Sequence, residues 1–598
     1  MKYTKWDIAE ILKRHQNERL FPEMDKIKEN AKHECFKEEV QKLRKIADDA
    51  IENPSRILPF TAYVNHLDND LKEKYGREFF DNRTKYNALA FMAIITDEDK
   101  YIKALEEEIW ILLNSFSWVT PGGVLKFDPL DGRDGVPIER MLDLTSTETA
   151  FTLAETDAIL GDKLNPFLRY HMKKEVMERV IDSYDNPSYI AWWESCEHNW
   201  AAVCGFSVAG AAMYYLKDDT ARLSEIIHRN LATMDLFLRG YGDDGACVEG
   251  ASYWAYGFSN YMFFAELLRE KTGGEITLTD DEKVREIAYY LHRTRTVGNK
   301  CINFEDSADS FSYRICLLHK LKSIFPDVTV PDLKYAMRYH SDHCYRWAGF
   351  IRDYTWFNEE ALSNEDTYVE NHFFKDAQIY ISHKADCCFA VTGGNNGYNH
   401  NHNDLGHFIY FKNGEDIFID LGQGRYVTGY FDMRYRYTHL NAGSQGHSVP
   451  VIGDELQKHG TERCVTYMDV KNGEADVVEM ELENAYALDV LNSLKRRFEF
   501  KKDGTLTMTD TFDMTKTEDI TEAFVVQTSS EPEFGDGFVA LEKNGVSVKL
   551  LYDKAFTEHE LVKIPADLTP LRPKEGRYII KLKAKNTQPK AEYVFEIK

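Results

Sequence analysis

Residues 399–422 read NHNHNDLGHFIYFKNGEDIFIDLG and place two alternate histidines in an Asn-rich loop ahead of two strand-like runs. The runs HFIYF and IFID on either side of NGED predict a β-hairpin. Asp420 ends the second strand, close to the base of the loop that carries His400 and His402. In an extended segment these two histidines would lie on the same side, about 6–7 Å apart.

This loop is a candidate metal site. His447 follows in a Gly/Ser-rich segment ahead of another predicted strand. Two imidazoles and a carboxylate from separate strands match the ligands that zinc prefers. The spacing alone fits equally well with loop histidines that cap turns together with their asparagine neighbours, so both interpretations stay open.

The hydrophobic pattern changes along the chain. Up to about residue 365, apolar residues recur every three or four positions, which predicts helices, some of them apolar on several faces. We expect helical hairpins stacked in an arc or ring. After about residue 370, short strand-like runs with turn dipeptides at 503–504 and 544–545 predict an antiparallel β-sandwich. The predicted domains are therefore residues 1–370 and 371–598, with the change inside 360–380.

Composition excludes several classes of protein. The formal net charge of −26 is the opposite of a nucleic-acid-binding footprint. No apolar run approaches the ~20 residues of a membrane span, and the first residues lack the apolar core of a signal peptide. We therefore expect a cytoplasmic protein, unless a leader was removed. The 10 cysteines are scattered without a regular spacing, which predicts reduced thiols.

Three motifs in the C-terminal half resemble those of the heparinase II/III-like polysaccharide lyases. They are N-H-N-H-N-D-L-G at 399–406, D-L-G-x-G-x-Y at 420–426, and His447 before a V-P-V run. The resemblance extends toward the N-terminus through three helical segments, RMLDLTSTETAFTLAETDAIL, ESCEHNWAAVCGFSVAGAA and DDGACVEGASYWAY. The resemblance implies an incomplete (α/α) toroid followed by an antiparallel β-sandwich, with the active site in the cleft between them.

The resemblance also implies a reaction, the β-elimination of a uronate. The enzyme must remove the weakly acidic C5 proton, stabilise the dianion that forms at the carboxylate, and release the oxygen at C4. By resemblance, Asn199 hydrogen-bonds the carboxylate. Tyr253 takes the C5 proton, protonates the leaving oxygen, or does both. His400 is the second neutralising or proton-transfer group.

One zinc ion is implied by the same resemblance. His402, Asp420 and His447 would bind it, with water or another residue completing the shell. Its role would be structural, because it locks the hairpin and so aims His400. His407 has no role in this scheme, and a small polar residue is more usual at its position.

Further substrate contacts are implied for His198, Glu249 and Arg425. Some relatives carry an additional histidine directly after the asparagine, where this chain has Trp200. That difference favours a mechanism led by a tyrosine.

Two of these assignments have structural alternatives. Asn199 could instead cap the helix that begins near Trp200. Tyr253 has a neighbour one helical turn away, Tyr256, which is the most serious competitor for the catalytic role. Helix-spaced aromatic residues are also common in hydrophobic cores.

Three other functions compete with a lyase. An (α/α)-toroid glycoside hydrolase would use a pair of carboxylates, and the chain offers Asp243, Asp244, Glu249, Glu305 and Asp306. A metallo-β-lactamase shares H-x-H-x-D, but its fold alternates strands and helices and its aspartate is followed directly by histidine. A sugar-binding protein without catalysis is the third.

The expected partner is an acidic oligosaccharide or polysaccharide. A glycosaminoglycan-like substrate is favoured over alginate, and oligosaccharides cut from one end over long polymers. The sequence leaves the uronate, the linkage and sulfation open. It is compatible with a homodimer, and we expect neither a nucleic acid nor a membrane as partner.

Overall fold

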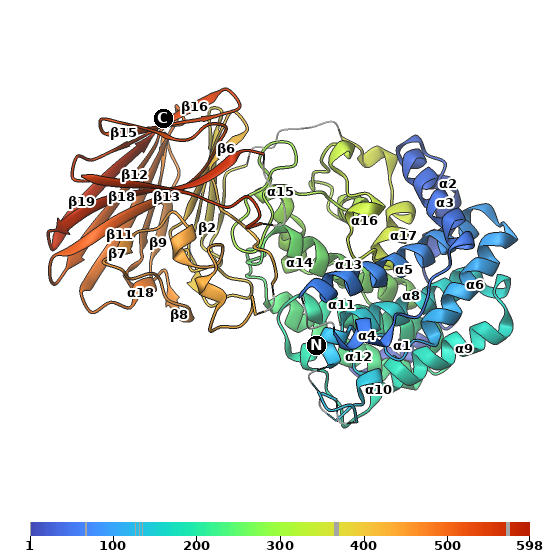
Figure 1. The fold of residues 1–598 in the computed structure, drawn as a ribbon. Coiled ribbons are helices and arrows are strands. Elements are labelled where there is room, and N and C mark those ends of the chain that lie inside the picture. The colour runs from blue at the N-terminus through green and yellow to red at the C-terminus, as the bar shows by residue number, and fades with distance from the viewer. Residues whose placement is uncertain are drawn as a thin grey trace. The chain divides into compact units, whose positions relative to one another are not determined.

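A computed structural model describes residues 2–65, 69–125, 127–130, 132–133, 135–363, 370–427, 429–569 and 574–598. Helices occupy the described chain up to residue 361, and strands begin at His372 (Figure 1). The predicted order of helices followed by strands is confirmed. Residues 364–369, inside the predicted change of pattern, lie outside the described residues.

Contacts divide the chain into two compact units. The helical unit contains Met1–Gly240, Ala255–Arg285 and Ser312–Asn364. The strand unit contains Glu365–Lys598 together with two segments from the first half of the sequence, Tyr241–Trp254 and Glu286–Phe311. The domain boundary at residue 370 stays a prediction. No helix in the described part of the chain is both long and apolar enough to cross a membrane.

Long helices dominate the helical unit. They are α1 (Lys5–Arg14), α3 (Lys37–Glu52), α5 (Asn69–Thr96), α6 (Asp99–Leu113), α8 (Leu144–Leu160), α9 (Pro166–Val176), α11 (Asn199–Tyr215), α12 (Thr220–Arg239), α13 (Ala251–Lys271), α16 (Ile315–Ile324) and α17 (Trp347–Thr355). The helix α13 begins in the strand unit and continues into the helical unit.

The helix α11 shows why some of these helices look apolar on every side. All of its residues are buried except Trp200 and Tyr214, and it packs against both α8 and α12. Gly210 allows a close approach, since a Cβ there would lie 2.7 Å from the ring of Phe151 on α8. The neighbouring α12 instead buries one face, as an outer helix does.

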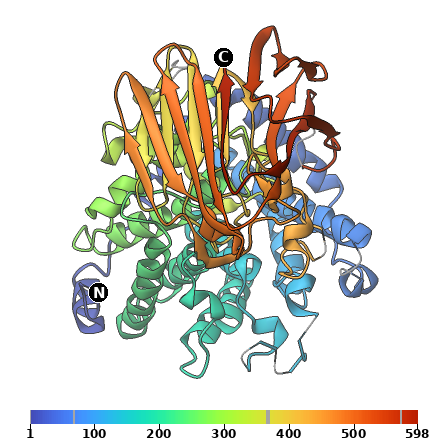
Figure 2. The same cartoon turned by 90° about the vertical axis from the view of Figure 1, so that its left-hand side faces the viewer.

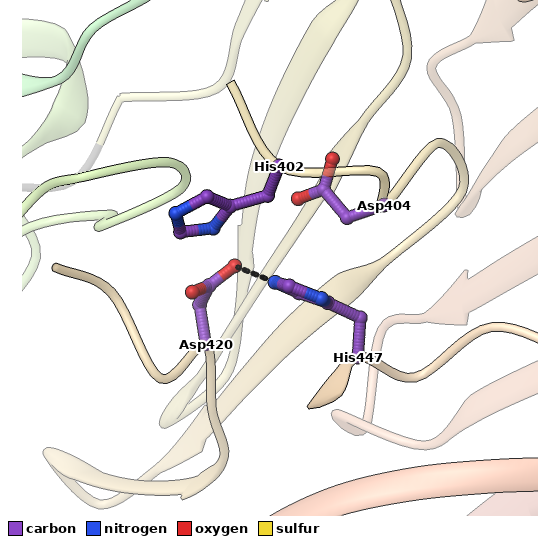
Figure 3. A group of neighbouring side chains, drawn as sticks. All are labelled: His402, Asp404, Asp420 and His447. Atoms are coloured by element: carbon purple, nitrogen blue, oxygen red, sulfur yellow. Dashed lines mark ion pairs between the residues drawn. The ribbon is translucent and has the colours of Figure 1, made fainter. Parts of the chain in front are cut away.

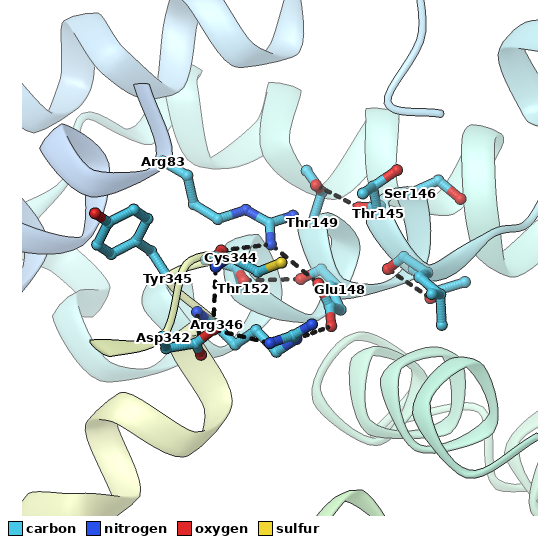
Figure 4. A network of polar contacts seen from close by, with 12 residues as sticks. Arg83, Thr145, Ser146, Glu148, Thr149, Thr152, Asp342, Cys344, Tyr345 and Arg346 are labelled. Atoms are coloured by element: carbon cyan, nitrogen blue, oxygen red, sulfur yellow. Dashed lines mark hydrogen bonds and ion pairs between the residues drawn. The ribbon is translucent and has the colours of Figure 1, made fainter. Parts of the chain in front are cut away.

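Glu148 on α8 joins distant parts of the helical unit (Figure 4). Its carboxylate accepts hydrogen bonds from Arg83 Nη1 at 3.0 Å, Arg346 Nε at 3.2 Å and the Tyr256 hydroxyl at 3.2 Å. Arg346 also pairs with Asp342 at 2.8 Å. These contacts tie α5, α8 and α13 to the segment just before α17.

Two antiparallel sheets form the sandwich of the strand unit (Figure 2). One contains β1 (His372–Phe374), β2 (Ile379–Lys384), β3 (Cys387–Thr392), β5 (Phe408–Lys412), β6 (Glu415–Phe418), β13 (Glu518–Thr528), β18 (Gly576–Thr587) and β17 (Glu558–Lys563) in that order, with β7 (Val451–Ile452) beside β13. The other contains β14 (Glu533–Gly535), β15 (Phe538–Lys543), β16 (Val546–Tyr552), β19 (Lys590–Ile597), β12 (Leu506–Met514), β11 (Leu491–Lys501), β10 (Ala475–Glu481) and β9 (Met468–Lys471). A small ribbon pairs β4 (Asn395–Asn396) with β8 (Gly460–Cys464).

The predicted hairpins are confirmed. The strands β5 and β6 pair through the turn at Asn413 and Gly414, whose φ angles of 48° and 77° are those of a tight hairpin turn. The pairs β11–β12 and β15–β16 turn at the predicted dipeptides. None of the 10 cysteines forms a disulfide in the structure.

Arg496 on β11 connects the core of the sandwich to the loops that carry the histidines. Its fully buried guanidinium pairs with Asp510 at 2.5 Å and Glu522 at 3.3 Å. Its Nη1 donates to the carbonyl oxygens of Gly406 at 2.9 Å and Ser448 at 2.8 Å. The two carbonyls belong to the segments that follow His402 and His447.

We predict that Arg496→Met destabilises the protein by about 3–5 kcal/mol, because it leaves buried carboxylates without a partner. Denaturant unfolding followed by circular dichroism measures this. The matched control is Arg497→Met on the same strand, whose partly exposed ion pairs contribute less than about 1 kcal/mol. Equal losses in the two variants would contradict the role given to Arg496.

Candidate active site and metal centre

The Asn-rich loop before β5 is held by its own asparagines. The Asn401 side-chain oxygen accepts a hydrogen bond from the Tyr437 hydroxyl at 2.7 Å, and the Asn403 side-chain nitrogen donates to the Gln457 carbonyl at 3.3 Å. The backbone of His402 donates to the carboxylate of Glu305. His400 has a φ of 58°, so the loop is not a regular strand. These contacts fix where both histidine side chains lie.

Both histidines bind one carboxylate, that of Asp306. His400 Nδ1 lies 2.9 Å from Asp306 Oδ2, and His402 Nε2 lies 3.2 Å from Oδ1. The hydroxyl of Tyr430 donates to Oδ1 at 3.0 Å, and Arg436 Nη2 donates to Oδ2 at 3.3 Å. Burial alone would raise the pKa of Asp306, but the hydrogen bonds from both histidines and the Arg436 charge lower it far below its usual range.

Tyr253 lies beside His400 and is joined to the same carboxylate by a second tyrosine. Its ring centroid is 4.3 Å from that of His400, and its hydroxyl is 2.8 Å from the Tyr426 hydroxyl. Tyr426 in turn donates to Asp306 Oδ2 at 3.2 Å. Because Tyr426 has one proton and gives it to a carboxylate, the hydrogen between the two phenols comes from Tyr253.

Burial raises the pKa of Tyr253 well above that of a free phenol, and the hydrogen bond with Tyr426 acts in the opposite direction. Both tyrosines are therefore protonated in the free protein at neutral pH. Tyr253 is ready to donate a proton, and it must lose one before it can act as a base.

Glu249 faces the other nitrogen of His400. Its Oε2 lies 3.8 Å from His400 Nε2 and is buried without a hydrogen-bond partner among the described residues. Burial raises the pKa of Glu249 to about 7; the nearby His400 opposes this rise and the Asp306 carboxylate adds to it. The predicted contact residue Glu249 is thus brought together with Tyr253 and His400.

Four side chains offer metal ligands at the end of the hairpin (Figure 3). Candidate ligand atoms of His402, Asp404, Asp420 and His447 all lie within 4.8 Å of one another, and all four residues are buried. The structure thus brings the three predicted ligands together and adds Asp404. Two histidines and two carboxylates can hold a divalent metal ion with no open position, which is typical of structural sites.

Hydrogen bonds leave the correct nitrogen of each histidine free for a metal. His447 Nδ1 lies 3.0 Å from the Gly443 carbonyl oxygen, so it carries the proton and Nε2 keeps its lone pair. His402 gives its Nε2 proton to Asp306, which leaves Nδ1. His402 Nδ1, His447 Nε2, Asp404 Oδ2 and Asp420 Oδ2 are all buried without a hydrogen-bond partner among the described residues. This is the arrangement in which metal-binding histidines are normally oriented.

Charge also favours a cation at this place. Burial and the neighbouring Asp420 carboxylate raise the pKa of Asp404 well above its ordinary value, and burial raises the pKa of Asp420 to about 6. Two buried carboxylates that repel each other are stabilised when a divalent ion neutralises them.

The backbone turn in the D-L-G segment after β6 requires glycine at position 422. Gly422 has a φ of 60°, and a Cβ there would lie 2.1 Å from the Ser307 carbonyl oxygen. Its amide donates to Asp420 Oδ1 at 2.6 Å, so glycine at this position both permits the turn and orients the ligand.

Asn199 and His198 belong to the helical unit. The structure shows that His198 is the N-cap of α11, with Nδ1 accepting from the Trp200 amide at 3.4 Å. Asn199 is the first residue inside the helix, so the alternative that Asn199 is the cap is wrong. Its proposed contact with a substrate stays a prediction.

Tyr256 differs from Tyr253 in its surroundings. Its hydroxyl donates to Glu148, and the guanidinium of Arg346 lies 4.1 Å from its ring centroid. Burial raises its pKa well above the ordinary value. The hydroxyl and ring of Tyr256 thus belong to the ion network of the helical unit, whereas Tyr253 lies beside His400.

Arg425 is exposed on the loop after β6. The guanidinium that the structure places beside Asp306 is that of Arg436, at 3.3 Å. The role of Arg425 in substrate binding stays a prediction.

Sequence reasoning missed several members of this cluster. Tyr426 ends the D-L-G-x-G-x-Y segment and Asp404 lies in the opening motif, so both had a signal. Asp306 was considered only as an acid of a hydrolase. Tyr430 and Arg436 carry no pattern that distinguishes them from other loop residues, and only the fold brings them to Asp306.

Several of the carboxylates that could serve a hydrolase already accept hydrogen bonds from neighbouring groups. Asp306 accepts from several donors, and Glu305 accepts from the His402 backbone. Asp244 accepts from the amides of Ala246, Asp376 and Ala377. Glu249 is the candidate that lies next to His400.

No family model matches the sequence, and no curated protein matches it. Solved structures share its fold. Heparinase III is 15% identical with a TM-score of 0.62, covering 96% of this chain and 92% of that one. The heparan sulfate lyase HepC from Pedobacter heparinus is 13% identical with a TM-score of 0.59, covering 89% and 76%. Chondroitin AC lyase from Streptomyces coelicolor A3, solved with chondroitin sulphate, is 11% identical with a TM-score of 0.55, covering 96% and 82%.

These similar structures are polysaccharide lyases, and the similarity at such low identity concerns the fold. It confirms the fold class predicted from the sequence, an incomplete (α/α) toroid followed by an antiparallel β-sandwich. The alternating fold of a metallo-β-lactamase is therefore wrong for this chain.

We predict about one divalent metal ion per chain in protein purified without added metal, measured by elemental analysis. Asp404→Asn and His447→Ala should each weaken retention at least ~10-fold, because each removes a ligand. Lowering the pH should release the ion, since protons compete for the same carboxylates and imidazoles. His383→Ala is the control, a half-buried histidine on β2 outside the cluster; an equal loss in that variant would contradict the site.

Proposed function

We propose that this protein is a lyase that cleaves uronate-containing glycans by β-elimination and leaves a 4,5-unsaturated uronate at the new end. The observation that carries the proposal is the chain of hydrogen bonds from Tyr253 through Tyr426 to Asp306, beside His400. A β-elimination needs a proton donor and a proton acceptor next to one sugar, and this cluster offers two phenols and an imidazole.

Tyr253 is the proposed proton-transfer residue. As an acid it gives its hydroxyl proton to the leaving oxygen at C4. As a base it takes the C5 proton after its own proton has passed to solvent, and Tyr426 then turns its hydroxyl hydrogen toward the phenolate. In both roles Tyr426 holds the Tyr253 oxygen at 2.8 Å, so we propose that Tyr426 takes part as well.

His400 is the proposed second group. Asp306 accepts the proton on Nδ1, which fixes the ring and leaves Nε2 facing Glu249. From Nε2 the neutral imidazole can accept a proton, and the doubly protonated imidazolium can donate to the uronate carboxylate. Asn199 would donate its amide hydrogens to the same carboxylate, where negative charge develops. His198, Glu249 and Arg425 would contact the substrate.

Zinc is the metal that fits the proposed site best, because two imidazoles and two carboxylates match its ligand preferences. When bound, it would supply charge that holds the hairpin and the loop together. β-Elimination needs no activated water, so His402, Asp404, Asp420 and His447 would act by fixing the loop that carries His400.

The proposed substrate class is a glycosaminoglycan-like oligosaccharide. Two of the similar structures are named for heparan sulfate and chondroitin, and both of these polymers contain uronates. A hydrolase with paired carboxylates is the alternative, and the product distinguishes the two.

The test is a panel of uronate polymers and oligosaccharides, including sulfated and unsulfated glycosaminoglycans and alginate, assayed by ultraviolet absorbance. A lyase produces a conjugated unsaturated uronate that absorbs, and a hydrolase produces new reducing ends without absorbance. Reducing ends without absorbance would overturn the proposal, and binding without any turnover would favour a sugar-binding protein.

We predict that Tyr253→Phe lowers the elimination rate by roughly 10²–10⁴-fold, because it removes the proton-transfer oxygen and keeps the ring. Oligosaccharide binding and the far-ultraviolet circular dichroism should stay unchanged. Tyr256→Phe is the matched control one helical turn away, and it should keep most of the activity while losing some stability. The reverse result would move the catalytic role to Tyr256.

A uronoside with a good leaving group at C4, such as fluoride, separates the two roles of Tyr253. Fluoride needs little help from an acid as it leaves. We predict that Tyr253→Phe regains activity on this substrate if the tyrosine is the acid, and stays inactive if it is the base. Full activity of Tyr253→Phe on natural substrate would assign both roles to other residues, His400 first.

A further inference from the structure

His407 is a buried histidine next to the metal centre that takes no part in the proposed reaction. It lies between the Asn-rich loop and β5 and is 0% exposed. Its ring centroid is 5.1 Å from that of His447. A polar ring in such a place needs hydrogen-bond partners, because an unpaired buried polar group costs stability.

Hydrogen bonding fixes the tautomer of His407. The amide nitrogen of Ser448 lies 2.9 Å from His407 Nδ1. A backbone N–H can only donate, so Nδ1 holds a lone pair and the single ring proton is on Nε2. His407 therefore cannot offer Nε2 to a metal, although it lies close to two residues that can.

The Nε2 atom lies 3.3 Å from an acceptor, Asp420 Oδ2. Both atoms are buried and have no other hydrogen-bond partner in the described part of the chain. The other oxygen, Oδ1, is already held by the Gly422 amide at 2.6 Å.

We propose that His407 is a positioning residue for the metal ligand Asp420. Its Nε2–H occupies one lone pair of Oδ2 and leaves the other for the metal, so that Asp420 binds through a single oxygen. The inference rests on the metal centre proposed above. Gly422 and His407 then hold the two carboxylate oxygens from opposite sides, as outer groups of metal sites commonly hold their ligands.

Two variants separate this role from ordinary packing, because asparagine and glutamine each copy one nitrogen of histidine. In His407→Asn the side-chain oxygen can replace Nδ1 as the acceptor for Ser448, and the donor to Asp420 is lost. In His407→Gln the side-chain nitrogen can replace Nε2 as the donor to Asp420, and the acceptor for Ser448 is lost.

The measurement is metal affinity by competition with a chromogenic zinc chelator, with thermal unfolding of the same proteins after metal removal. We expect His407→Asn to bind zinc about 10–100-fold more weakly and to keep the stability of the metal-free native protein. We expect His407→Gln to stay within about 3-fold of native zinc affinity and to unfold at a lower temperature when metal-free, since the Ser448 amide loses its partner.

His383→Asn and His383→Gln on β2 are the matched controls, and neither should change zinc affinity. Native affinity in His407→Asn would overturn the inference. Equal loss of affinity in both His407 variants would also overturn it, by reducing the histidine to a packing role. Native protein that binds no zinc would instead refute the metal centre itself, which is a distinguishable result.

Discussion

The carboxylate of Asp306 is the interaction on which the rest of the site depends. It receives hydrogen bonds from two histidines, two tyrosines and one arginine, all from segments far away in the sequence. Because one acceptor serves all of them, the proposed proton-transfer residues and the loop of the proposed metal centre are held by the same carboxylate. His400 on one side and His402 on the other are oriented by its two oxygens. Moving this carboxylate would therefore disturb the proposed chemistry and the metal centre together.

Different hydrogen-bond partners distinguish the two tyrosines of α13. Tyr253 and Tyr256 are one turn apart, and both have a pKa raised by burial. The hydroxyl of Tyr256 is used by Glu148, an ion-paired carboxylate of the helical unit. The hydroxyl of Tyr253 meets another phenol that can change the direction of its hydrogen bond. A hydrogen bond that can reverse suits a residue that transfers a proton, and a bond to a fixed ion pair suits one that maintains structure.

Periodicity and turn chemistry made the secondary structure predictable, since the hairpin at Asn413 and the inner helix α11 depend on local pattern. That His402, Asp420 and His447 lie together was predicted from the family resemblance, because their spacing alone fitted turn-capping histidines equally well. Asp306, Tyr430 and Arg436 were not, because hydrogen bonds between residues 94–130 positions apart leave no local pattern. The proposed role of His407 could not be predicted from local pattern either, because it depends on which of its nitrogens accepts the hydrogen bond from the Ser448 amide.

The ion pair between Glu148 and Arg346 also has a consequence for how the chain is made. The two residues are 198 positions apart, and Arg83 and its partner carbonyl at Cys344 are 261 apart. At about 5–20 residues per second, the ribosome needs roughly 10–40 s to add the segment between Glu148 and its arginine. During that interval Glu148 can pair with Arg83 on α5 but still lacks Arg346. The helical unit can therefore complete its folding only after most of its sequence has emerged from the ribosome. Until then its first helices are exposed to aggregation.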